Sequence, residues 1–290
     1  MKKILLPISL LVVIFLIVLF VLIPVKNKPQ KEVDTPPATE PETPKSWAEQ
    51  MQEKYPYFVT DYETRYQSYQ QQHPELAEED VITYVNIGLD QEFYTNTKPT
   101  SFLNSNQILV NKYHYVDQNY VPDNLVALPT TYAKSGISLV EEAKTALESL
   151  MAAAQAEGYR LHVTSAYRSY DYQQNLYDRY VAQDGKEAAD TYSARAGSSE
   201  HQTGLAVDLD NTKSDYTLFE QTPEYTWMQD NASKYGFILR FPKGKESITG
   251  YQFEAWHYRY VGIDLAQKIK SSGLTFEEYY ARYLDPVVLS

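Results

Sequence analysis

Two histidines, His201 and His257, stand among residue types that bind metal ions. The first lies in the segment SEHQTGLAVD (199–208), which ends at Asp208, and the second closes the segment EAWH (254–257). Two imidazoles and one carboxylate leave the fourth position of a tetrahedral Zn²⁺ ion for water, which is the composition of a catalytic zinc site. A free glutamate nearby can then take a proton from that water. The spacing alone equally allows two histidines whose polar atoms are satisfied within a core.

The other histidines and the absent motifs narrow the chemistry. His73 and His114 lie among polar and tyrosine residues, and His162 falls in an expected strand, so we predict structural roles for all three. The 290 residues include no cysteine, which excludes disulfides, zinc–thiolate sites, a cysteine nucleophile and a lipid-modified N-terminal cysteine. The S-x-x-K, G-x-S-x-G, H-E-x-x-H and P-loop signatures are missing too.

The elements that must position these residues are helices and short strands in irregular order. An S-x-x-E capping box at 138–141 predicts a helix whose apolar face includes positions 143, 147, 150 and 154. Because the order lacks a regular βαβ alternation, it predicts an α+β fold. The other expected elements are helices at 61–72, 170–181, 223–235, 263–270 and 276–283, and strands at 159–165, 205–209, 237–240 and 253–260.

The spacing of Glu254 and His257 sets a condition on the last strand. Residues i and i+3 face opposite sides of a regular strand. These two side chains can therefore share a site only if the chain bends or bulges between them, or if Glu254 precedes the strand.

Charge and hydropathy divide the chain into unlike parts. Residues 1–46 carry a net charge of +2 and the remainder −14, and an acidic protein is not expected to bind nucleic acid. The apolar run at 4–25 is long enough to cross a bilayer as a helix, and Lys2 and Lys3 favour a cytoplasmic N-terminus. We predict an uncleaved signal anchor, with a cleaved signal peptide as the alternative.

The same contrasts predict four segments. Residues 1–25 form a cytoplasmic tip and transmembrane anchor, and the proline-rich segment 26–46 forms a disordered stalk because it has too few apolar residues to fold. Residues 47–107 form an N-terminal helical extension, and residues 108–290 form the domain that carries both histidine segments. The protein is thus expected in the cell membrane as a single-pass protein with its C-terminal domain outside the cell.

The pattern S-x-H-x-x-G-x-A-x-D followed by E-x-x-H resembles that of VanY-type zinc D-alanyl-D-alanine carboxypeptidases, whose fold group also includes lysostaphin-type peptidases and hedgehog domains. Every fixed position of both motifs is present in 199–208 and 254–257. The segment SAYRS (165–169) resembles the family's S-x-Y-R-S segment, and two glutamines follow it at 173–174. The resemblance implies a small antiparallel sheet with flanking helices and a zinc carboxypeptidase domain at 108–290.

Residue by residue, the resemblance implies three groups of roles. The first group binds Zn²⁺. The second does the chemistry: one residue acts as general base and then as acid toward the leaving amine, and another holds the scissile carbonyl oxygen as charge develops. The third lines the terminal D-alanine of the substrate. The metal ligands would be His201, Asp208 and His257, the catalytic residues Glu254 and Arg168, and the substrate-binding residues Ser199 and Gln174.

The function that the resemblance implies is removal of the terminal D-alanine from peptidoglycan stem peptides by metal-activated water. The motifs do not separate D,D-cleavage of a pentapeptide from L,D-cleavage of a tetrapeptide. One alternative is a peptidoglycan endopeptidase of the same fold. Another is a non-catalytic wall-binding module, although such a module would be expected to lose the base, which is kept here at Glu254.

Overall fold

The computed structural model describes residues 44–211 and 215–289, and Lys45–Ser290 forms one compact unit. The predicted transmembrane anchor at 1–25 and all but the last three residues of the predicted stalk lie outside the described residues. Within the described ranges, no helix combines the length and the hydropathy needed to cross a bilayer.

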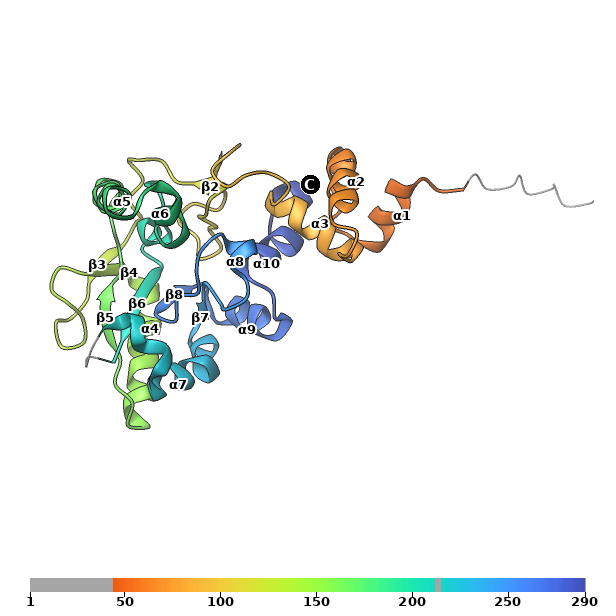
Figure 1. Ribbon diagram of the computed structural model, residues 1–290. Coiled ribbons are helices and arrows are strands. Elements are labelled where there is room, and N and C mark those ends of the chain that lie inside the picture. Colours follow the sequence, from red (N-terminus) through yellow and green to blue (C-terminus); the bar gives the residue numbers. More distant parts are fainter. Residues whose placement is uncertain (1–43, 212–214, 290) are drawn as a thin grey trace, which may run out of the picture. The chain divides into compact units, whose positions relative to one another are not determined.

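A four-stranded antiparallel sheet forms the centre of the fold, in the order β5-β6-β8-β7 (Figure 1). Every residue of its two inner strands, β6 (Ala206–Asp210) and β8 (His257–Tyr260), is buried. Both faces of this pair are therefore covered. The prediction of an α+β fold with a small antiparallel sheet is confirmed. The outer strands are β5 (His162–Ser165) and β7 (Phe237–Leu239).

Helix α4 (Glu141–Ala156) packs its apolar face into the main core. Its buried residues recur every three to four positions, at Ala143, Leu147, Leu150 and Ala154, as the sequence predicts. The predicted capping box is wrong, because Ser138 lies in strand β4 (Ser138–Val140), paired with β3 (Leu125–Ala127). The backbone of Ser138 pairs with Ala127 of β3, so this residue cannot cap the helix. The helix begins without a hydrogen bond from a capping side chain.

The N-terminal helices surround an aromatic core of their own. Helices α1 (Trp47–Lys54), α2 (Glu63–Gln72) and α3 (Glu78–Ile87) enclose a cluster that includes Phe58 and the fully buried Tyr66. Helix α3 packs on α10 (Phe276–Tyr283) (Figure 1).

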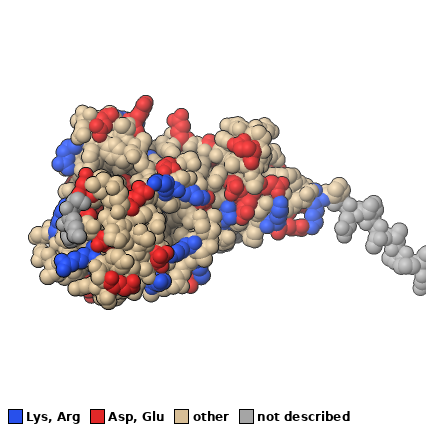
Figure 2. Space-filling view, turned by 60° about the horizontal axis from the view of Figure 1, so that its bottom comes forward, with Lys and Arg blue, Asp and Glu red and all other residues tan. Residues whose placement is uncertain are grey.

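The remaining elements connect and cover these parts. Strand β8 is shorter than predicted and begins only at His257, and the predicted helix at 223–235 changes to a 3-10 turn after Asn231. Figure 2 shows acidic and basic side chains interspersed over the face in view, without a continuous basic patch there. The other elements are β1 (Lys98–Pro99), β2 (His114–Tyr115), α5 (Tyr170–Asp184), α6 (Lys186–Tyr192), α7 (Pro223–Asn231), α8 (Glu246–Thr249), α9 (Ile263–Ser272) and α11 (Pro286–Leu289).

Candidate metal centre and catalytic cavity

Strand pairing brings two of the predicted ligands together. Asp208 on β6 lies directly across from His257 at the start of β8, although 49 positions separate them in the chain. His201 comes from the 3-10 turn η2 (Glu200–Thr203), which ends at Gly204 with a φ of 67°. A side chain there would be strained and would press on Leu125, so glycine allows the turn that returns His201 toward the strands.

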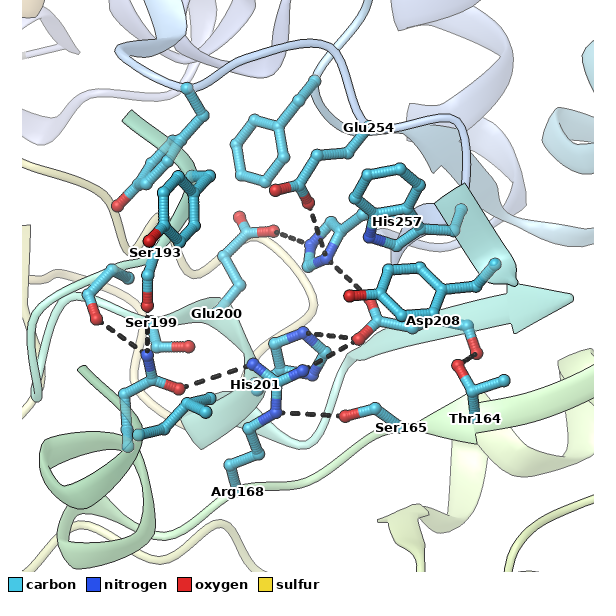
Figure 3. A pocket seen from close by; sticks show the side chains of 18 of the residues that line it. Thr164, Ser165, Arg168, Ser193, Ser199, Glu200, His201, Asp208, Glu254 and His257 are labelled. Atoms are coloured by element: carbon cyan, nitrogen blue, oxygen red, sulfur yellow. Dashed lines mark hydrogen bonds and ion pairs between the residues drawn. The ribbon is translucent and has the colours of Figure 1, made fainter. Parts of the chain in front are cut away.

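The ligand atoms of these residues have the spacing that a metal ion requires. Nδ1 of His257 lies 3.0 Å from Oδ1 of Asp208, and Nε2 of His201 lies 3.4 Å from Oδ2 of Asp208. Ligand atoms on tetrahedral Zn²⁺ at about 2.0–2.1 Å are about 3.3 Å apart. Nδ1 of His201 lies 2.6 Å from the carbonyl oxygen of Ala166. The other ring nitrogen, Nε2, is thereby directed toward Asp208 (Figure 3). His201, Asp208 and His257 therefore fit a zinc ion.

The electrostatics of the three residues also suit a cation. Burial, together with the charge of Arg168, lowers the pKa of His201 to about 4, so this imidazole is neutral, as a ligand must be. Burial alone would lower the pKa of His257, but Asp208 and Glu200 raise it to about 9. This surplus of carboxylates stabilises a positive charge at His257, which either a proton or a metal ion can supply.

Glu254 lies beside the ligands and meets the condition set by the sequence. It precedes β8, and its Oε2 lies 3.8 Å from Nδ1 of His257 (Figure 3). Burial raises the pKa of Glu254 to about 7, with Asp208 acting in the same direction and His257 against it. A carboxylate whose pKa lies near neutrality can both accept and return a proton, which suits a general base.

Arg168 reaches the same centre from the segment that follows β5. Its NH2 group donates to Oδ2 of Asp208 at 2.9 Å and its Nε donates to Oγ of Ser165 at 3.0 Å (Figure 3). Its NH1 group faces Oε1 of Gln173 at 3.4 Å. The guanidinium is therefore held at the ligand carboxylate, inside the cavity that the ligands line.

The cavity has a volume of ≈ 590 Å³ and contains six of the seven predicted site residues. Ser199 lines it and is buried, whereas Gln174 does not line it and instead donates to Asp178. The preceding residue, Gln173, lines the cavity, and its Nε2 donates to the carbonyl of Ala194 at 2.7 Å. Gln173 is buried because it lies on the same face of α5 as Tyr177, four residues further on, whereas Gln174 lies beside this face.

The sequence prediction also missed aromatic residues and one acid. Tyr216 and Trp256 line the cavity as a T-shaped pair with ring centroids 5.0 Å apart, and Tyr180 pairs with Tyr192 in the same way at 5.1 Å. Several of the 27 tyrosines therefore belong to the cavity wall. The acid is Glu200, which the first motif contains at a variable position. No local pattern marks it, because its partners come from distant parts of the chain.

Comparisons with known proteins identify a matching family and similar structures. The family model "D-alanyl-D-alanine carboxypeptidase" (VanY) matches residues 136–263. The protein YodJ of Bacillus subtilis (strain 168) is 39% identical over 209 residues, which cover 68% of this chain and 77% of YodJ. The structure of the LD-carboxypeptidase LdcB is similar with a TM-score of 0.57 and 42% identity, covering 60% of this chain and 85% of that one.

A second similar structure contains a zinc ion. It is a variant of the vancomycin-resistance D,D-pentapeptidase VanY in complex with Zn(II). Its TM-score to this chain is 0.52 at 37% identity, and the match covers 60% of this chain and 98% of that one.

Proposed function

Because the chain belongs to the VanY family of D-alanyl-D-alanine carboxypeptidases, we propose that it is a zinc-dependent carboxypeptidase that removes the terminal D-alanine from peptidoglycan stem peptides. One observation carries the proposal. His201, Asp208 and His257 converge on one point, and the carboxylate of Glu254 lies beside them in the same cavity.

The residues around the metal site have separate roles in peptide hydrolysis. Zinc, when bound, acts as a Lewis acid and brings the pKa of a water ligand to about 7. Glu254 accepts the proton of the attacking water and later gives it to the leaving amine of D-alanine. Arg168 lines the same cavity, where its guanidinium charge stabilises the negative charge that develops on the scissile carbonyl oxygen.

Two further residues shape the place for the terminal D-alanine. Ser199 is buried in the cavity wall, and Gln173 joins Arg168 to the carbonyl of Ala194 on the facing loop. We assign the substrate contacts to these two residues. Their support is that both line the cavity that contains Glu254.

We further propose that the enzyme works outside the cell while anchored to the membrane. The support is the apolar run at 4–25, the proline-rich segment at 26–46 and the acidic character of the rest of the chain. The anchor would keep the cavity close to the wall polymer on the outer face of the membrane. Cell fractionation, with a protease added to whole cells, tests this placement: the domain should stay with the membranes and be accessible from outside.

The proposed reaction is tested with the purified full-length chain in detergent, loaded with Zn²⁺. It is incubated with a stem tetrapeptide ending in L-Lys-D-Ala and with the pentapeptide ending in D-Ala-D-Ala, and free D-alanine is measured by mass spectrometry. Release from at least one of the two peptides is expected, and the ratio of the two rates assigns the specificity, since an LD-carboxypeptidase and a D-alanyl-D-alanine carboxypeptidase are both 42% identical to this chain. The Glu254→Gln variant is the control. No D-alanine from either peptide, or cleavage only at an internal bond, would contradict the proposal.

A further inference from the structure

The second ring nitrogen of His257 faces Glu200. Nε2 of His257 lies 3.6 Å from Oε2 of Glu200 (Figure 3). Both atoms are buried, and neither has a hydrogen-bond partner among the described residues. The distance is slightly longer than a hydrogen bond, and a shift of a few tenths of an ångström closes it. A donor and an acceptor that lack any other partner thus point at each other.

The other oxygen of Glu200 is fixed by two arginines. Oε1 of Glu200 accepts from Nε of Arg240 and from NH1 of Arg259, both at 2.8 Å. The side chains of both arginines are fully buried. The carboxylate therefore cannot rotate away from His257 without taking the ion-pair partner from the buried guanidinium of Arg259, which is strongly unfavourable.

The arginines connect this carboxylate to two distant segments. NH1 of Arg240 donates to Oε2 of Glu277 on α10 at 2.8 Å, and NH2 of Arg259 donates to the carbonyl of Ile108 at 2.6 Å. Glu277 is also buried. Two carboxylates and two guanidinium groups make this network neutral overall, which lowers the cost of burying it.

We infer that Glu200 is a positioning residue of the metal centre: it accepts the Nε2–H of His257 and thereby fixes Nδ1 as the metal-binding atom. A carboxylate that holds the N–H of a metal-binding imidazole sets both its tautomer and its ring orientation. Nδ1 of His257 is the nitrogen that lies 3.0 Å from Asp208 and faces Glu254. The network makes α10 a structural support of the metal centre, although α10 lies beyond the matched residues 136–263.

The first test measures zinc affinity of the full-length protein by competition with a chelator. Loss of a supporting partner of this kind costs about 10–100-fold in metal affinity, so Glu200→Gln should bind Zn²⁺ at least tenfold more weakly. The matched control is Asp90→Asn, which breaks the ion pair of Asp90 with Arg65 at 2.6 Å in the N-terminal region. The control should leave the affinity unchanged. A folded Glu200→Gln protein whose affinity stays within twofold of wild type overturns the inference.

Two further variants keep the test decisive. If Glu200→Gln does not fold, the zinc affinity of Glu200→Asp tests the inference. This variant keeps the negative charge but moves the carboxylate away from His257. A folded Glu200→Asp protein with unchanged zinc affinity overturns the inference as well. Glu277→Gln should weaken zinc binding by a smaller factor, and an unchanged affinity there would overturn the supporting role of α10.

The tautomer of His257 can be read directly in the wild-type protein. With Zn²⁺ bound, nitrogen NMR of labelled histidine should show a protonated Nε2 and a metal-bound Nδ1 in His257. A metal-bound Nε2 would overturn the inference whatever the variants do. The inference rests on the metal site of the proposed function, but its tests read zinc affinity and tautomer rather than D-alanine release. A failure here is therefore distinguishable from a failure of the proposed reaction.

Discussion

The metal centre and the N-terminal helices α1–α3 are both well packed, but different interactions hold them. Around the metal centre, charged groups such as Glu200, Arg240 and Asp208 are buried and each has a specific partner. In the helical region the buried groups are chiefly aromatic and aliphatic, and the ion pairs lie nearer the surface. Buried charge demands exact partners, whereas apolar packing tolerates local change. We therefore expect substitutions around the metal centre to change activity or zinc affinity, and substitutions among helices α1–α3 to change the free energy of unfolding.

Loss of the metal should produce the largest effect. Loss of an outer partner already lowers metal affinity by about 10–100-fold, so Asp208→Ala, which removes a ligand, should lower it by more than about 100-fold. Release of D-alanine should fall to background. Treatment of the wild type with a chelator should have the same result, and added Zn²⁺ should restore activity to the wild type alone. Substantial activity in the metal-free wild type would contradict the zinc mechanism.

Replacing the base should abolish turnover while keeping the metal. Glu254→Gln is expected to reduce kcat by about 10²–10⁴-fold, the usual contribution of general acid–base catalysis. Because Glu254 is not one of the three converging ligands, zinc affinity should stay near that of the wild type. The exposed Glu157→Gln is the matched control and should retain full activity. Unchanged kcat in Glu254→Gln would remove this residue from the mechanism.

His114 lies beside α10, the helix on which α3 packs. Its protonation should make the free energy of unfolding depend on pH. It is buried against Tyr280 of α10, and burial lowers its pKa to about 3. In the unfolded chain a histidine has a pKa of about 6.5, so the unfolded state binds the proton first as pH falls. The free energy of unfolding should drop by about 1.4 kcal/mol per pH unit between these values, and remain unaffected above them.

The variant His114→Gln should flatten this part of the stability–pH profile. The amide can still donate to Oδ1 of Asn111, which lies 3.2 Å from Nδ1 of His114, but it does not titrate. Chemical unfolding at a series of pH values measures the slope. His73→Gln, at a partly exposed histidine, is the control and should leave the slope as in wild type. An unchanged slope in His114→Gln would show that another group is responsible.

The two neighbouring glutamines of α5 should behave differently. Gln173→Ala removes a hydrogen bond to Arg168 and one to the carbonyl of Ala194, so kcat/KM should fall by about 10–100-fold. Gln174→Ala is the matched control because this side chain donates to Asp178 at the surface and does not line the cavity, and it should stay within about twofold of wild type. Equal effects of the two substitutions would contradict the assignment of the substrate contact to Gln173.

The smallest effect concerns the helical region and should appear in stability alone. The hydroxyl of Tyr66 donates to Oδ1 of Asn86 at 2.5 Å and accepts from the N–H of Val59. Tyr66→Phe should lower the free energy of unfolding by about 1–3 kcal/mol because it leaves these groups unsatisfied. Zinc affinity should not change. The more exposed Tyr69→Phe should have little effect on either quantity, and a loss of zinc affinity in Tyr66→Phe would show that the two regions are coupled.

The sequence indicated the metal ligands because their two short segments match the motifs of a known family, whereas the spacing alone left structural histidines equally possible. His201 and Asp208 lie on the two sides of a turn that requires Gly204, and Glu254 lies three residues before His257. The apolar face of α4 was equally predictable, since its period follows from helix geometry. Ser138 shows the limit of such local patterns, because the strand pairing of β4 with β3 replaced the predicted cap.

The residue types, their spacing within short segments and the helix periodicity were determined by the sequence alone, because they depend on neighbours a few positions apart. The tertiary structure decided which atoms meet. It placed Asp208 across from His257, turned Gln173 rather than Gln174 into the cavity, and brought Glu200 to the second nitrogen of His257. These outcomes depend on strand register, helix rotation and buried partners from distant segments, and no local pattern encodes them.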